Sequence, residues 1–433
     1  MAADPFVEKP PLMYWSGALA ARLASGVLPI FPGAQIAVLA WMLLACACVG
    51  RLAQEMHGKV SFDWLAPMLM LGSLGAIEPV HKLTADVPQL AGAALALAAL
   101  ARLARVENRV RLLGLLLGTG AGIAFLSKGL LVVGVLSLTC LAALMLPAYR
   151  TRRYAAALAC AVLAALPWVV IWPALLWHTS HPLFIEWLWN NNFGRFFGFA
   201  HLGGERKARL EDLAGLIVVT FPAGWLAVAA LIATLRAEGW RRYGSGHPEF
   251  ALLWCYVLLF VATLLISSVY RDVYALPILP ALAVLGAGVL LPSRIGKTCG
   301  TLAIVLMSTL GVFLWVRWGL QLTGYGRVAA GPIGTWLPLD YQLAFSPWLV
   351  LVALLLSALW IAAIALRREL GALTLGFAGL TFVWGTLTTL LLPWINEARS
   401  YRTPFAELRE ALPRPTPGRA PYSCVGSYGV GDF

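Results

Sequence analysis

Charged residues are scarce in this sequence. Of its 433 residues only 12% are Asp, Glu, Lys or Arg, whereas a soluble globular domain contains about 25%. Hydrophobic residues make up 60% of the chain, and the mean hydropathy is +0.80. This balance excludes a soluble globular protein and indicates a membrane protein.

Alternation of apolar and polar residues is missing from the hydrophobic runs. A transmembrane β-barrel requires that period of two, and the remaining way to satisfy the backbone in lipid is the α-helix. We therefore predict an all-α, polytopic protein. About twelve runs come near the length needed to cross a bilayer core. They cover residues 33–50, 60–78, 84–104, 109–126, 129–147, 154–177, 213–235, 250–269, 272–291, 298–317, 347–366 and 370–393.

Cysteine is sparse and shows no pattern. Six of the seven cysteines lie in or at the edge of apolar runs, and Cys424 alone lies in a polar tail. Cys46 and Cys48 point to different faces of one predicted helix. The cysteines therefore give no framework, and we interpret them as small core residues.

The runs divide the chain into three parts. Residues 1–32 form an outer-side segment next to the membrane, where the short amphipathic stretch 12–28 predicts an interfacial helix. Residues 33–393 form the transmembrane domain. Residues 394–433 form a short outer tail, rich in Pro and Gly.

The net charge of +12 is distributed along the chain in alternating junctions. By the positive-inside rule the basic junctions are cytoplasmic, and the excess charge indicates contact with anionic membrane lipids rather than nucleic acid. The N-terminal segment, the loops 178–212 and 318–346, and the tail after Pro393 then lie outside. The basic junctions hold Arg51 and Lys59; Arg102, Arg105, Arg109 and Arg111; Arg150, Arg152 and Arg153; Arg236, Arg241 and Arg242; Arg294 and Lys297; Arg367 and Arg368.

An acid and a cation begin the chain's most distinctive stretch. Glu8 and Lys9 precede two prolines, which fix φ and remove two backbone donors, so the pair lies on a stiff, extended segment. Tyr14 and Trp15 follow and are typical of a membrane–water interface. The pair is either part of a site at the mouth of the membrane domain or a solvated charge pair ahead of the first helix.

Other ionisable residues gather on the same predicted outer side. Ionisable groups at membrane depth are functional candidates by default. For Arg271 and Asp272 the commonest alternative is a neighbouring ion pair. The set comprises Glu78, His81, Lys82, Asp86, Lys128, the loop 184–196, His201, Glu205, Arg206 and the turn 270–277.

Four motifs occur in order along this outer side. They are Glu-Lys-Pro-Pro-Leu-x-Tyr-Trp from Glu8, Ser-Lys-Gly around Lys128, Gly-Arg-Phe around Arg195 followed by His201, and Arg-Asp-x-Tyr-x-Leu-Pro from Arg271. Together they resemble the C-type, polytopic glycosyltransferases. The branch with the bacterial lipid A aminoarabinose transferase and the protein O-mannosyltransferases is the most similar. The resemblance runs from about residue 5 to residue 290.

The resemblance implies a reaction and a place for it. Members of the family take a sugar from a polyprenyl phosphate donor and pass it to a lipid A, glycan or protein acceptor. They do so on the periplasmic side of the bacterial inner membrane. Because the leaving group is a lipid phosphate, the site needs cations to stabilise the charge that develops on it.

The resemblance also implies roles for particular residues. Lys9, Arg206 and Tyr274 match phosphate-binding positions of the family, and Arg271 belongs to the same donor-binding set. Asp86 resembles a catalytic acid near the donor.

Glu8 and His201 match positions that bind a divalent metal, such as zinc, in the lipid A branch. Two ligands are too few to predict a zinc site from sequence alone.

The start of the chain departs from the family pattern. Members begin with a further membrane helix and an outer loop with an acidic motif, and neither precedes Glu8 here. We expect an N-terminally truncated or mis-started member whose transfer activity is reduced or lost.

The alternative is a non-enzymatic transporter or a degenerate paralogue. Many transporters carry internal repeats, and no repeat is evident in this sequence. The clustering of charge at one surface favours the enzyme.

Overall fold

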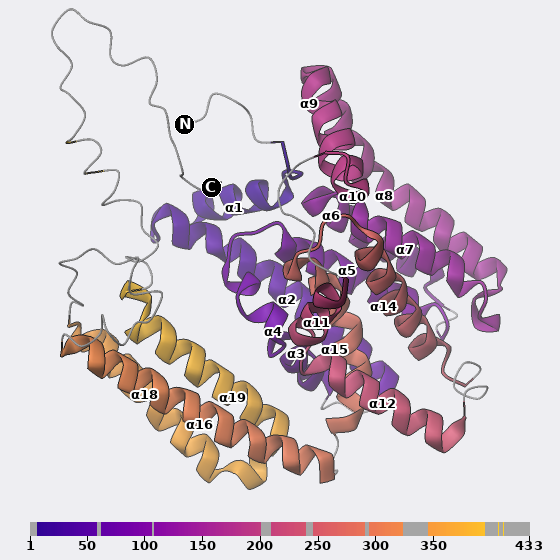
Figure 1. The fold of residues 1–433 in the computed structure, drawn as a ribbon. Coiled ribbons are helices and arrows are strands. Elements are labelled where there is room, and N and C mark those ends of the chain that lie inside the picture. The colour runs from indigo at the N-terminus through magenta and orange to yellow at the C-terminus, as the bar shows by residue number, and fades with distance from the viewer. Residues whose placement is uncertain are drawn as a thin grey trace, which may run out of the picture. The chain divides into compact units, whose positions relative to one another are not determined.

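The computed structural model of the protein is built of helices in its described part, which confirms the predicted all-α class (Figure 1). The structure describes residues 7–58, 62–105, 108–200, 209–239, 246–290, 294–323, 345–394, 406 and 410. The first half of the chain forms α1 (Leu12–Leu23), α2 (Ile30–His57), α3 (Phe62–Leu71), α4 (Leu74–Ile77), η1 (Pro79–His81), α5 (Asp86–Arg102), α6 (Val110–Lys128), α7 (Leu130–Ala143), η2 (Pro147–Tyr149), α8 (Arg152–Thr179), α9 (His181–Ile185), the π-helix η3 (Glu186–Gly194) and α10 (Arg195–Phe197).

The second half of the chain continues with helices of similar composition. They are α11 (Arg209–Val219), α12 (Ala223–Glu238), α14 (Pro248–Ile266), η4 (Asp272–Ile278), α15 (Leu279–Ala287), η5 (Gly288–Leu290), α16 (Arg294–Leu322), α18 (Pro347–Ala365) and α19 (Arg367–Leu390).

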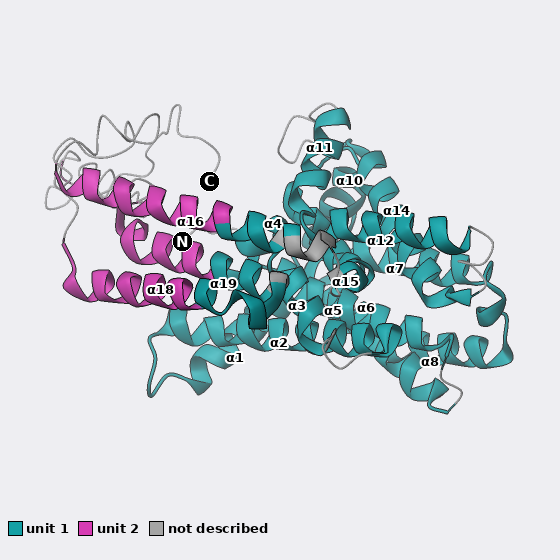
Figure 2. Cartoon of the chain, turned by 90° about the horizontal axis from the view of Figure 1, so that it is seen from below, with its two compact units in different colours: residues 1–304, 363–380 teal, residues 305–362, 381–433 magenta. Residues whose placement is uncertain are grey.

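The chain forms two compact units (Figure 2). Unit 1 comprises Met1–Ile304 and Ala363–Leu380, and unit 2 comprises Val305–Ala362 and Thr381–Phe433. Within unit 2, aromatic residues hold the helices together. Trp360 stacks on Phe382 with ring centroids 5.8 Å apart. All the candidate site residues fall within unit 1.

Helix α5 is the core of unit 1. Fifteen of its 17 residues are buried, because alanine and glycine dominate its sequence and let neighbouring helices approach on every side. It packs against α2, α6, α14 and α15. Its N-terminal residue, Asp86, is therefore held at a fixed place in the unit.

Glycines bring α6 into direct backbone contact with two neighbours. A Cβ at Gly92 of α5 would lie 2.6 Å from the Gly120 carbonyl oxygen of α6. A Cβ at Gly118 would lie 2.0 Å from the Ala161 carbonyl oxygen of α8. Small residues that allow such close approach are typical of helix packing in membranes. The layer α5–α6–α8 fixes Lys128, the last residue of α6.

Six described helices are long and apolar enough to cross a membrane, or seven if one bent pair counts as a single span. The protein is thus a multi-pass membrane protein, while the predicted count of about twelve spans is not confirmed. The stretch 213–235, predicted as one span, is two helices, α11 and α12, bent by 88°. Pro222 precedes α12, and a proline without its N–H cannot continue the ladder of α11.

The predicted interfacial helix is α1. It begins directly after Pro11, as expected for a helix that starts behind a proline pair. Its exposed side chains are largely apolar and include Tyr14, Trp15, Leu19 and Leu23. Aromatic and leucine side chains exposed on a short helix fit a position at the membrane surface.

The two ends of α5 differ in charge chemistry. At its C-terminal end Glu55 accepts hydrogen bonds from Arg51 at 3.2 Å and from Arg102 at 2.6 Å. Arg105 there pairs with the buried carboxylate of Glu249. About 26 Å away along the helix, at 1.5 Å per residue, the N-terminal end holds the polar residues of the predicted outer side. The structure thus places this basic junction and the candidate site at opposite ends of α5.

Candidate active site

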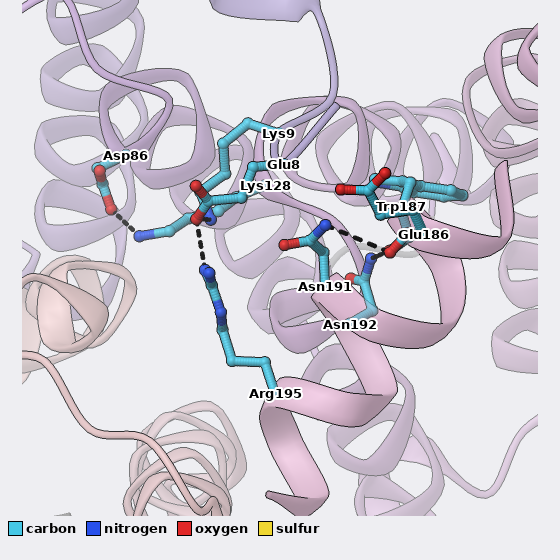
Figure 3. Close-up of polar contacts among 9 residues, drawn as sticks. All are labelled: Glu8, Lys9, Asp86, Lys128, Glu186, Trp187, Asn191, Asn192 and Arg195. Carbon is cyan, nitrogen blue, oxygen red and sulfur yellow. Dashed lines mark hydrogen bonds and ion pairs between the residues drawn. The ribbon is translucent and has the colours of Figure 1, made fainter. Parts of the chain in front are cut away.

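Glu8 and Lys9 lie on the extended segment that precedes Pro10 and Pro11. The Glu8 Oε1 atom accepts hydrogen bonds from Lys9 Nζ at 2.9 Å and from Arg195 Nη1 at 2.5 Å (Figure 3). Burial opposes ionisation of this carboxyl, but the hydrogen bonds from Arg195 and Lys9 outweigh burial and lower the pKa of Glu8 to about 2. Glu8 is therefore an anion that joins two cations from distant parts of the chain.

Lys9 is a half-buried cation of the site. Burial lowers the pKa of Lys9 below its ordinary value, the Glu8 carboxylate opposes this shift, and the nearby charges of Lys128 and Arg195 add to it. Three cations thus lie close enough to repel one another. The carboxylates of Glu8 and Asp86 neutralise two of these three positive charges, which leaves an excess of one.

Lys128 pairs with Asp86 where α6 ends and α5 begins. Only 9% of the Lys128 side chain and 11% of the Asp86 side chain are exposed. The Lys128 Nζ atom also lies 4.4 Å from the centroid of the Tyr274 ring, a cation–π distance. The Lys128 ammonium group is therefore held from two sides, by the Asp86 carboxylate and by the face of the Tyr274 ring.

Gly129 turns the chain sharply from α6 into α7. Its φ of +93° is readily adopted only by glycine. A Cβ there would lie 2.3 Å from Asn192 Oδ1, and this oxygen accepts a hydrogen bond from the Leu130 amide at 3.3 Å. The turn thereby links Lys128 to the π-helix η3.

The π-helix η3 forms one wall of the site. Asn191 and Asn192 donate from their side chains to the carbonyls of Glu186 and Trp187, at 3.3 and 2.8 Å (Figure 3). Trp187 is buried and anchors the wall. π-helical turns are rare and frequently occur at functional sites.

These elements enclose a cavity of about 290 Å³. Lys9, Lys128 and Arg195 line one part of it, whereas their carboxylate partners Glu8 and Asp86 are not among its lining residues. The rest is mainly apolar and is lined by α7 and α14, through Leu131, Val135, Leu138 and Leu264. The arrangement suits an anion with a long apolar tail.

Comparison with known proteins bears on this site. Residues 8–177, which include Glu8, Lys9, Asp86 and Lys128, match the family model of the dolichyl-phosphate-mannose-protein mannosyltransferases. The resemblance predicted from the motifs is confirmed. No curated protein gives a significant match to the chain.

Two solved structures share the fold. ArnT from Cupriavidus metallidurans bound to undecaprenyl phosphate has a TM-score of 0.66 at 18% identity, over 94% of this chain and 70% of ArnT. The same enzyme in the apo state has a TM-score of 0.60 at 17% identity, over 90% of this chain and 68% of ArnT. This chain therefore shares the polytopic helical fold of ArnT.

The residues predicted for donor binding fall into three groups by their place in the structure. Lys9 and Tyr274 line the cavity, and their phosphate-binding roles stay predictions. Arg271 is exposed and is not among the lining residues. Arg206 lies outside the described residues, so its role stays a prediction. The same holds for His201, which was predicted as a metal ligand.

The catalytic role predicted for Asp86 also stays a prediction. The structure places its carboxylate against Lys128 rather than on the cavity surface.

The zinc prediction is not tested, because His201 lies outside the described residues. Glu8 is already held by two cations, and no group of three or more His, Cys, Asp or Glu residues in the described ranges could hold a metal ion. The zinc prediction for Glu8 and His201 therefore rests on the resemblance alone.

Sequence reasoning assigned no role to Lys128 or Arg195. Both lie within the motifs that carry the resemblance, and both belong to the predicted outer side. Their function becomes visible only when residues separated by 42 and 187 positions in the chain meet.

Proposed function

We propose that this protein transfers a sugar from a polyprenyl phosphate donor to an acceptor, which is a lipid A, a glycan or a protein. The observation that carries the proposal is the cavity that joins three cations to an apolar wall. The match to the mannosyltransferase family model supports the reaction class. An ArnT structure bound to undecaprenyl phosphate shares the fold and supports the donor class.

The proposal gives the cations one task. Lys9, Lys128 and Arg195 bind the donor phosphate and stabilise the negative charge that grows on it as the sugar leaves. Charges fixed in place before the reaction are effective because they need no reorganisation. Arg206, from the segment outside the described residues, is proposed to join them, and Arg271 to meet the donor at the exposed edge.

Asp86 is proposed as the general base whose carboxylate receives the proton of a hydroxyl acceptor. In the described state Lys128 holds this carboxylate. A bound phosphate competes for Lys128, which loosens the ion pair and makes Asp86 available as a base. The proposal thus couples donor binding to activation of the base.

The proposed location is the bacterial inner membrane, with the cavity on the periplasmic side. The separation of the site from the arginine-rich end of unit 1 supports it, since cytoplasmic ends carry the excess of Lys and Arg.

The test is binding of undecaprenyl phosphate by the purified full chain in detergent. We expect Lys9→Ala to weaken binding by roughly ten- to a hundredfold, as for loss of a hydrogen bond between charged groups. Lys82→Ala is the matched control, because Lys82 is exposed and pairs only locally with Glu78. Unchanged affinity of Lys9→Ala for undecaprenyl phosphate would reject the assignment of the phosphate site to this cavity.

Transfer itself is tested with a radiolabelled lipid-linked sugar and lipid A or peptide acceptors in proteoliposomes. The expected result is a labelled acceptor. Movement of the labelled lipid between leaflets without any labelled acceptor would instead identify a transporter.

A further inference from the structure

Gln89 is a buried amide in the wall of the cavity. Gln89 is 1% exposed, yet it lines the cavity together with Lys9, Lys128 and Arg195. Its Nε2 atom has no hydrogen-bond partner among the described residues. The cavity therefore contains a neutral donor that nothing in the described protein satisfies.

Such a donor is costly in the ligand-free protein. A buried N–H without an acceptor loses its hydration and gains no hydrogen bond in return. An apolar residue of similar length would avoid this loss. The amide is explained if a ligand brings an acceptor oxygen to it.

The position of Gln89 identifies that oxygen. Gln89 is three residues after Asp86 on α5, so both side chains lie on the same face of the helix. Asp86 holds Lys128 at the N-terminal end of α5, and Gln89 lines the same cavity as Leu131 and Val135 of α7. Gln89 thus lies where the cationic part of the cavity meets its apolar part.

A polyprenyl phosphate in this cavity would have its phosphate group at the cations and its apolar chain along α7 and α14. The phosphate group then lies next to the boundary between the two parts of the cavity. We infer that Gln89 is a specificity residue of the donor cavity, whose Nε2 donates a hydrogen bond to a phosphate oxygen of the bound polyprenyl phosphate. The inference rests on the proposed function. The amide N–H fixes the orientation of the phosphate through a directional hydrogen bond, whereas the other groups of the site attract it mainly by charge. Because the amide is neutral, it does not increase the repulsion among the three cations.

The experiment compares Gln89→Met with the wild-type full chain. Methionine keeps the length of the side chain and removes the amide. We expect the affinity for undecaprenyl phosphate to fall roughly ten- to a hundredfold, because the lost acceptor is charged. We expect the melting temperature of the ligand-free protein to stay equal or to rise, because an unsatisfied buried donor has been removed.

These opposite signs separate ligand binding from a structural role. A residue that only supports the fold would lower the melting temperature when replaced. Gln54→Met on α2 is the matched control, because it makes the same change at the far end of unit 1, where Gln54 meets Arg51. Gln89→Leu provides a second apolar variant with a different shape.

Two results would overturn the inference. One is unchanged affinity for undecaprenyl phosphate in both Gln89 variants while the glycosylated donor binds less tightly, which would assign the amide to the sugar. The other is an equal loss of affinity for undecaprenol, which has no phosphate. Failure of the wild-type chain to bind undecaprenyl phosphate would instead reject the proposed function.

Discussion

Lys9 shows how a single residue acquires its properties from the fold. Its partner Glu8 is adjacent in the chain. The pKa of Lys9, however, is lowered by burial and by the charges of Lys128 and Arg195. The sequence predicts the local pair and the proline-stiffened backbone. It cannot predict the burial, because that depends on helices far along the chain.

This perturbation gives a prediction about pH. Binding of a phosphate requires the protonated form of Lys9, and a lowered pKa means that this form is lost at a lower pH than the ordinary 10.5. Affinity for undecaprenyl phosphate should therefore fall as the pH rises through the alkaline range. Glu8, with a pKa of about 2, remains ionised throughout and contributes no pH dependence there.

Lys9→Arg isolates this effect, because arginine stays protonated across the whole range. We expect weaker binding than wild type at neutral pH, since the planar guanidinium differs in shape from the ammonium, together with a flatter profile at high pH. Lys82→Arg serves as the control. Parallel profiles for wild type and Lys9→Arg would exclude Lys9 as the titrating group.

At the scale of elements, the apolar runs predicted the helices well. Most predicted runs correspond to a helix or a helix pair, because continuous hydrophobicity of this length leaves the backbone few other solutions in lipid. The break between α11 and α12 was missed, although Pro222 marks it. The π-helix η3 was missed as well, since its sequence differs little from that of an α-helix.

The glycines of α6 were a second overlooked pattern. Gly114, Gly118 and Gly122 recur every four residues, so they lie on one face of the helix. All three meet α8 so closely that a Cβ would lie within 2.8 Å of an atom of that helix. The pattern indicates close packing, but the sequence does not say which helix is the partner.

We predict opposite effects for the same substitution in two helices. Gly118→Ala should destabilise the protein, because the new Cβ would lie 2.0 Å from the Ala161 carbonyl oxygen and the helices must separate. Overpacking of this kind costs typically about 1–3 kcal/mol. Gly319→Ala in α16 has open space around its Cβ and should gain about 0.5–1 kcal/mol from helix propensity.

Thermal unfolding of the two purified variants in detergent measures the difference. The melting temperature should fall for Gly118→Ala and remain equal or rise for Gly319→Ala. An unchanged melting temperature for Gly118→Ala would show that the contact between α6 and α8 is looser than described.

At the scale of the whole molecule, the site depends on topology. Its residues come from the segment before α1, the start of α5, the end of α6, η3, α10 and η4. A helix that runs from the basic side to the outer side delivers its last residue to the site, as α6 does with Lys128. The sequence predicted this gathering on one face from the alternation of basic junctions, but the individual contacts required the packing of the helices.

The same alternation gives a prediction that tests the whole assignment. Helix α8 has 28 residues and is therefore about 42 Å long at 1.5 Å per residue, enough to exceed the roughly 30 Å hydrocarbon core. Thr151 precedes it beside Arg152 and Arg153, and Ser180 follows it next to α9. A cysteine introduced at Ser180 should react with a membrane-impermeant maleimide from the periplasm, and one at Thr151 should react only after the membrane is opened. The unmodified chain is the control for its own half-buried cysteines. The opposite labelling pattern would place the cavity on the cytoplasmic side, where an acceptor on the outer face could not reach it, and would therefore reject the proposed periplasmic reaction.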